Sequence, residues 1–133
     1  MYKIKRHESL SENIFLIDVS APRVAEKCLP GQFVIVRADE KGERIPLTIC
    51  DYNRENGTVT LVVQIVGAST LKLSRLNEND GVEDIVGPLG VPSEIVTADD
   101  EFLKNKNIVF VAGGVGTAPV YPQVKYLSER GYK

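Results

Sequence analysis

An apolar run that breaks into closely spaced glycines limits what this chain can fold into. Residues 109–119 read Val-Phe-Val-Ala-Gly-Gly-Val-Gly-Thr-Ala-Pro, a pattern typical of a buried strand, a tight turn and a helix. Glycines in such a turn let the backbone approach a pyrophosphate, and the helix N-terminus offers free N–H groups to the anion. We therefore expect a parallel-sheet strand at 108–112, a helix from about Ala118 and a dinucleotide site between them. The alternative is a tight connection that binds nothing.

The candidate residues for this nucleotide site lie in the turn and in the first turn of the helix. They are Gly113, Gly114, Gly116, Thr117, Ala118 and Pro119, and their expected ligand is NAD(P)H. One strand and one helix cannot bury a parallel sheet. We expect this unit either to belong to a truncated domain or to pack on the rest of the chain or on a second copy of it.

Composition excludes several classes of protein. The 133 residues suit one core of about 100 residues and a remnant. A net charge of −2 argues against a nucleic-acid partner, and no apolar run approaches the length that crosses a membrane, so a cytoplasmic location is expected. The only cysteines, Cys28 and Cys50, are far apart in the sequence, which indicates neither a disulfide framework nor a pair of iron–sulfur ligands.

The first hundred residues have the rhythm of an all-β domain. Runs with β-branched residues and partial alternation are separated by Pro, Gly, Asn and Asp. Strands are expected at 2–9, 13–20, 32–38, 44–50, 58–66, 82–86 and 93–97. Asn56-Gly57 predicts a hairpin, and Gly87-Pro88-Leu89-Gly90 predicts a turn. The acidic and polar residues 98–107 indicate a linker, so we expect a β domain at 1–100 and the start of an α/β domain at 101–133.

A second possible anion site lies at Gly67-Ala68-Ser69-Thr70. This segment ends a strand and opens a short helix, expected at 69–77, whose N–H groups and hydroxyls could face a phosphate. The alternative is an ordinary helix whose Ser69 or Thr70 caps its own backbone.

Three motifs, at 44–48, 67–70 and 113–119, follow one another in an order that resembles the ferredoxin reductase-like flavoprotein superfamily. The residues of these motifs are most similar to those of the small flavin-carrying subunits of NADH-dependent reduced ferredoxin:NADP oxidoreductases, also called sulfide dehydrogenases. The electron-transfer subunits of dihydroorotate dehydrogenases are the nearest alternative. The resemblance implies a mainly β fold, in which an antiparallel Greek-key barrel binds FAD and the first β-α unit of a truncated Rossmann-like domain follows.

The resemblance also implies the cofactor residues and the partners. The FAD-binding residues are expected to be Arg44, Pro46, Leu47, Thr48, Gly67, Ser69 and Thr70. Thr48 suits the edge of the flavin ring because a strand there offers a hydroxyl beside backbone N–H groups. Arg44 suits the FAD phosphate, but it lies one residue further from Thr48 than in the family pattern, which reverses its face unless Pro46 bends the strand. A plain surface arginine is the alternative.

The implied activity is electron transfer between a pyridine nucleotide and an iron–sulfur cluster or ferredoxin. A [2Fe-2S] cluster is expected only in a cysteine-rich segment beyond these residues, and a larger flavoprotein or iron–sulfur subunit is the expected partner. The rival from another class is a barrel that holds no cofactor and serves only in binding or assembly. An unpaired apolar strand would also favour self-association.

Overall fold

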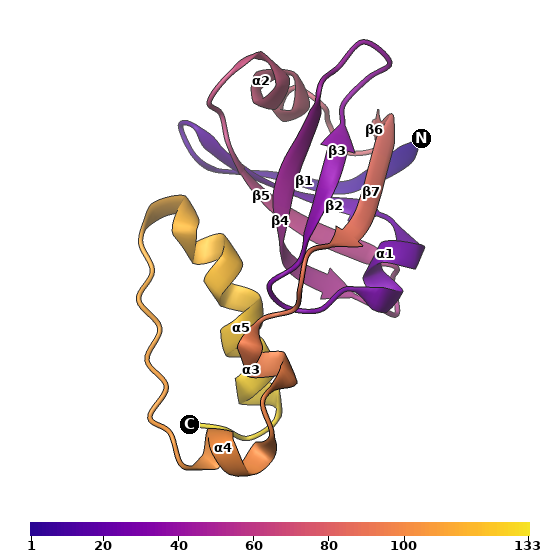
Figure 1. The fold of residues 1–133 in the computed structure, drawn as a ribbon. Helices are drawn as coiled ribbons and strands as arrows, with labels where there is room; N and C mark the ends of the chain where they lie inside the picture. Colours follow the sequence, from indigo (N-terminus) through magenta and orange to yellow (C-terminus); the bar gives the residue numbers. More distant parts are fainter.

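The computed structural model describes residues 1–133, and a curled β-sheet forms its larger part (Figure 1). The strands are β1 (Tyr2–Ser11), β2 (Ile14–Ser20), β3 (Phe33–Arg37), β4 (Arg44–Asn53), β5 (Thr58–Gln64), β6 (Gly81–Val82) and β7 (Asp84–Leu89). The helices are α1 (Pro22–Lys27), α2 (Ala68–Ser74), α3 (Glu94–Thr97), α4 (Asp100–Lys104), the 3-10 turn η1 (Gly114–Gly116) and α5 (Thr117–Glu129). No helix is long and apolar enough to span a membrane.

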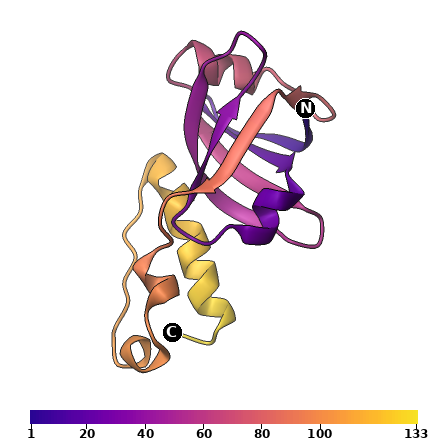
Figure 2. The same ribbon diagram turned by 45° about the vertical axis from the view of Figure 1, so that its right-hand side comes forward.

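The sheet has the Greek-key topology that the family resemblance implies. Its seven strands lie in the order β6-β1-β2-β5-β4-β3-β7, and every neighbouring pair is antiparallel. The consecutive strands β3, β4 and β5 form a meander, and β2 lies beside β5, which is the Greek-key arrangement. The edge strands β6 and β7 are joined through Glu83, so the sheet curls into a barrel, as Figure 2 shows. We call residues 1–92 the barrel.

Alternating side chains fill the barrel interior. On β5, Val59, Leu61 and Val63 are buried while the residues between them are half-buried, so the apolar face that the sequence predicts is the inner face. The other strands and the helices α1 and α2, with Ala21 and Cys28 at the two ends of α1, supply the remainder of a cluster of 17 buried hydrophobic residues. The hairpin before β5 is also confirmed, because Gly57 takes a φ of 66° between the antiparallel β4 and β5.

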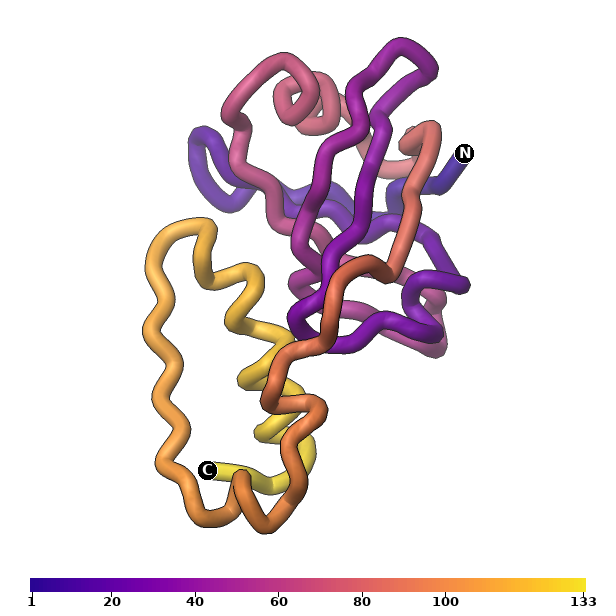
Figure 3. The backbone as a smooth tube through the Cα atoms, viewed as in Figure 1, coloured from indigo at the N-terminus to yellow at the C-terminus, as the bar shows by residue number.

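The chain after the barrel differs from the sequence expectation in three places. Residues 94–97 form helix α3 rather than a strand, because the Ser93 hydroxyl caps this segment by accepting the Ile95 N–H at 3.4 Å. The expected linker contains helix α4, which Asp99 caps by accepting the Phe102 N–H. Residues 108–112 form no strand, and Figure 3 traces them as a long irregular connection. A parallel strand needs a neighbour to pair with, and none lies beside this segment.

Two smaller expectations also need correction. Residues 87–89 belong to strand β7 rather than to a turn. Gly87 is required there by close packing, because an added Cβ would lie 2.8 Å from Val34 Cγ1. Helix α2 ends at Ser74, and its N-cap is Gly67 rather than Ser69 or Thr70. We call residues 93–133 the C-terminal unit, whose longest helix, α5, packs against β4 of the barrel (Figures 1 and 2).

Candidate functional site

An open groove lies where strand β4 changes partner. Residues 44–48 of β4 pair with β3, whereas pairing with β5 begins only at Ile49. On the N-terminal side of Ile49, strand β4 therefore separates from β5. A groove of about 530 Å³ lies there, beside residues 45–48 of β4 and residues 62–64 of β5. That volume is within the range of small-molecule and cofactor sites. We call it the β4–β5 groove.

The C-terminal unit forms the opposite wall of this groove. Val115, Gly116, Ala118 and Pro119 of η1 and α5 line it together with the barrel residues. No side chain caps the N-terminus of the 13-residue helix α5, and the dipole of the helix favours negative charge there. The Thr117 N–H itself donates within the preceding η1 turn, to the Gly114 and Val115 carbonyls. Gly114 has a φ of 56°, a left-handed conformation that suits glycine.

The groove brings together residues from all three sequence motifs. These are Pro46, Leu47 and Thr48 from β4, Thr70 from α2, and Gly116, Ala118 and Pro119 from the glycine-rich segment. The apolar side chains supply flat contact surface, and the Thr48 hydroxyl can donate and accept hydrogen bonds. Because residues 45–48 have no strand on the β5 side, some of their backbone N–H and C=O groups point to the groove. A planar heterocycle with a polar edge fits this lining.

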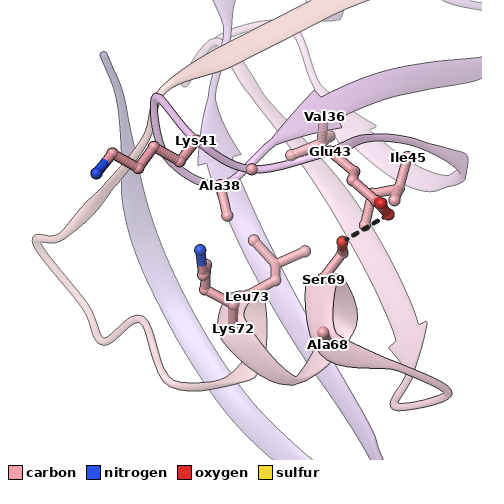
Figure 4. Close-up of a pocket in the computed structure, with 10 residues that line it drawn as sticks. Val36, Ala38, Lys41, Glu43, Ile45, Ala68, Ser69, Lys72 and Leu73 are labelled. Carbon is pink, nitrogen blue, oxygen red and sulfur yellow. Dashed lines mark hydrogen bonds between the residues drawn. The ribbon is translucent and has the colours of Figure 1, made fainter.

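Ser69 lies in a separate pocket. Figure 4 shows this pocket of about 200 Å³ between helix α2 and the loop after β3. Ser69 Oγ donates to Glu43 Oε2 at 3.3 Å, and Lys72 pairs with Asp39 at 2.8 Å. The hydrogen bond from Lys72 holds the pKa of Asp39 below its usual range. Ile45 lines both this pocket and the β4–β5 groove, so the two are neighbours.

Thr70 shapes the turn that separates these two spaces. Its Oγ1 accepts the N–H of Val66 at 2.9 Å and that of Gly67 at 3.1 Å, and the hydroxyl donates to the Gly67 carbonyl. The capping that the sequence allows for Thr70 is therefore present, but it comes from the third helical position. Gly67 itself is exposed, lines neither space and has an extended backbone with open space around it.

Arg44 is engaged elsewhere. Its guanidinium pairs with Asp84 of β7 at 2.6 Å, and this hydrogen bond holds the pKa of Asp84 below its usual range. The register from Arg44 to Thr48 is unbroken, so Pro46 does not reverse the strand. Arg44 and Thr48, four residues apart, therefore lie on the same side of β4. Arg44 does not line the groove.

A second, apolar groove of about 330 Å³ adjoins the first. Gly114 and Thr117 line it together with Cys50, Leu10 and Tyr121, and we call it the Cys50 groove. Burial raises the pKa of the Cys50 thiol to about 11, so the thiol stays protonated at neutral pH.

The last predicted nucleotide residue, Gly113, lines neither groove. An added Cβ there would meet no atom within 4 Å.

Several residues that line the β4–β5 groove do not appear among the sequence candidates. They are Ile45, Val62, Val63, Gln64, Val66 and Val115. Val66 is 77% exposed. The available signal was the pair of valines, Val62 and Val66, on the outward, otherwise polar face of the strand expected at 58–66, because neighbouring exposed apolar side chains can form part of a binding surface.

The chain matches known proteins over nearly all of its length. It is 61% identical over 131 residues to an uncharacterized protein in the adh 3′ region of Clostridium beijerinckii, covering 98% of this chain and 44% of that protein. It is 43% identical to the dihydroorotate dehydrogenase B (NAD(+)) electron transfer subunit homolog of Thermotoga maritima, covering 97% of this chain and 43% of that protein.

Solved structures show the same fold. The structure of the NADH-dependent reduced ferredoxin-NADP oxidoreductase superimposes with a TM-score of 0.89 at 42% identity, covering 98% of this chain and 45% of that one. Phthalate dioxygenase reductase matches with a TM-score of 0.73 at 21% identity, covering 99% and 40% of the two chains, which supports the fold alone. The chain thus spans less than half the length of each of these relatives.

The family model of the oxidoreductase FAD-binding domain matches residues 1–92. This range holds all seven strands of the barrel, and it includes the β4 and β5 walls of the groove. The chain belongs to the oxidoreductase FAD-binding domain family.

Proposed function

We propose that the β4–β5 groove holds the flavin of FAD and that the chain is the flavin module of an oxidoreductase. In this proposal, electrons pass between a pyridine nucleotide and an iron–sulfur cluster or ferredoxin. The observation that carries it is the separation of β4 from β5 opposite the glycine-rich segment. The same groove is therefore lined by residues of the expected FAD motif in the barrel and by residues of the candidate nucleotide-binding loop.

Different residues of the groove would contact different parts of FAD. FAD, when bound, takes a hydride and releases electrons singly. Pro46 and Leu47 would contact the ring through apolar surface and exclude water from one side. The Thr48 hydroxyl would hydrogen-bond its polar edge. Ser69, in the adjoining pocket, stays a candidate for the FAD phosphates, whereas Arg44 would have to leave Asp84 to reach them.

The C-terminal unit supplies the candidate contact with the nucleotide. The uncapped N-terminus of α5 favours negative charge, so Gly113, Gly114, Gly116 and Thr117 stay candidates for NAD(P)H, with Ala118 and Pro119 shaping the wall. A [2Fe-2S] cluster, a larger partner subunit, a domain boundary near residue 100 and a cytoplasmic location stay predictions. So does self-association, which the exposed Val109 and Val111 favour and which sedimentation across concentrations would test.

A second candidate function is that of an electron-transfer subunit of dihydroorotate dehydrogenase. The 43% identity to the Thermotoga maritima homolog favours it. It differs in the companion protein and in the final electron donor or acceptor. Co-purification with a dihydroorotate-oxidising subunit would support this candidate over the first.

Visible absorption spectroscopy tests the flavin proposal. We expect the purified chain to keep a yellow FAD spectrum after incubation with excess FAD and desalting, and to bind FMN more weakly. Thr48→Val should weaken FAD binding by about five- to tenfold through one lost hydrogen bond. Thr58→Val, at the far end of β5, is the matched control and should leave the affinity unchanged. A colourless chain that ignores FAD would contradict the proposal and favour a binding or assembly module.

A further inference from the structure

The β4–β5 groove has walls from two units, so its width depends on how α5 lies on the barrel. Residues 45–48 and 62–64 form the barrel wall, and Val115 to Pro119 form the other. Residues 108–112 form no strand that could hold the C-terminal unit in a sheet. The position of α5 must therefore come from its direct contacts.

The apolar part of that contact is small. On α5, the buried residues are Ala118, Pro122 and Leu127. The larger side chains Tyr121 and Val124 remain 46% and 41% exposed. Because apolar stabilisation scales with the area removed from water, these few buried side chains hold the helix only weakly against the barrel.

A charged pair adds to this contact. Lys125 Nζ lies 2.8 Å from Asp51 Oδ1, with side-chain exposures of 37% and 28%. Asp51 follows Thr48 by three residues on β4, and Lys125 follows Pro119 by six on α5. The pair therefore lies about 10 Å from the groove along either element. The strand irregularity between Ile49 and Asp51 re-aims the end of β4 at this point.

A neutral hydrogen bond supports the same helix from another element. Ser93 Oγ donates to Gln123 Oε1 at 2.7 Å, and the Ser93 N–H donates to the Pro30 carbonyl of the barrel at 2.8 Å. Gln123 also donates to the Pro119 carbonyl at 3.0 Å, in the groove wall itself. Lys125 thus connects α5 to the barrel directly, whereas Gln123 reaches it only through Ser93.

We propose that Asp51 and Lys125 form a latch that positions α5 and thereby sets the width of the β4–β5 groove. They are positioning residues, because neither lines that groove. Breaking the pair lets α5 move away from β4 and carries Gly116 and Pro119 away from Thr48. The inference rests on the proposed function for its effect on FAD, but the position of α5 is measurable without any cofactor.

The test uses Asp51→Asn, Lys125→Met and the charge exchange Asp51→Lys with Lys125→Asp. Residual dipolar couplings of the α5 amides, compared with those of the barrel, report the helix orientation in the FAD-free chain. FAD titration of the same proteins reports affinity. Lys104→Met is the matched control, because Lys104 pairs with Asp100 at the same 2.8 Å but lies on α4 with 67% of its side chain exposed.

We expect both single variants to reduce the α5 couplings relative to the barrel and to weaken FAD binding by about two- to fivefold. The charge exchange should restore both, and Lys104→Met should change neither. Unchanged α5 couplings in the single variants would overturn the latch. If the α5 couplings respond but the unaltered chain takes up no FAD, the latch stands and the proposed flavin function fails.

Discussion

The barrel and the C-terminal unit are both rich in apolar residues, yet only the barrel buries them in one cluster. Seventeen hydrophobic residues form a continuous core inside the barrel. In the C-terminal unit the buried apolar residues are Leu103, Ala118, Pro122 and Leu127, while Val109 and Val111 are 82% and 90% exposed. An antiparallel meander finds its partners nearby in sequence, whereas a parallel strand needs neighbours from crossover connections. The local sequence pattern is therefore enough to specify the fold of the barrel but not that of the C-terminal unit.

Matched leucine truncations should show this contrast most strongly. Leu61 is 0% and Leu127 5% exposed, so both are buried, one in each region. Leu61→Ala should lower the free energy of unfolding by about 3 kcal/mol, because it leaves a cavity in a continuous core. Leu127→Ala should lower it by less than about 1 kcal/mol, because α5 can undock without unfolding the barrel. Urea denaturation measures both, and equal losses would mean that the two regions unfold as one.

Matched glycine substitutions should give a smaller difference. Gly31 has a φ of 97°, and an added Cβ would lie 2.6 Å from the backbone nitrogen of Ser93, at the junction of the two regions. Gly31→Ala should cost about 1–3 kcal/mol of stability. Gly113→Ala, with an extended backbone and no atom within 4 Å of the new Cβ, should change it by less than about 0.5 kcal/mol. A stability loss at Gly113 equal to that at Gly31 would show that the glycine-rich segment is also tightly packed.

The modification rates of the two cysteines distinguish opening of the Cys50 groove from unfolding of the barrel. Cys28 is fully buried in the core, whereas Cys50 lines a groove closed partly by α5. At pH 8, iodoacetamide followed by mass spectrometry should modify Cys50 roughly tenfold faster than Cys28, because undocking of α5 needs less free energy than global unfolding. Equal rates would contradict independent opening.

The same thiols predict a dependence of stability on pH. Burial raises the pKa of each from 9.0 to about 11. At neutral pH, well below 9.0, both thiols are protonated in the folded and unfolded chains, so they add no pH dependence there. As the pH rises from 9.0 to about 11, only the unfolded thiols ionise, and the free energy of unfolding should fall. Urea denaturation across this range should show a smaller fall in a Cys28→Ala variant.

The barrel was predictable because its signals are local. The alternation in residues 58–66 identifies the buried face of β5, and Asn56-Gly57 identifies the hairpin before it. The strand predicted at residues 93–97 was wrong. Isoleucine, valine and threonine favour strands, but the Ser93 cap starts a helix there. The strand predicted at residues 108–112 was also wrong, because such an apolar run is typical of a parallel strand that has neighbours on both sides.

The candidate site was predictable only in part. The motifs named Thr48 and Gly116 as candidates, and the fold brings both to one groove, while their cofactor roles stay predictions. They did not reveal that Arg44 pairs with Asp84, or that Lys125 pairs with Asp51, 74 residues away. Such pairs depend on which strands and helices lie side by side. The turn that directs Ser69 toward Glu43 likewise depends on the Thr70 hydroxyl at the third helical position.

The most direct test of a flavin in the β4–β5 groove is an FAD titration followed by amide chemical shifts across the whole chain. We expect the largest shifts on residues 45–48, 62–70 and 115–119, in both regions at once. Shifts concentrated instead around the cavity that Tyr2, Arg23 and Asp84 line between α1 and β7, with those three segments silent, would contradict it.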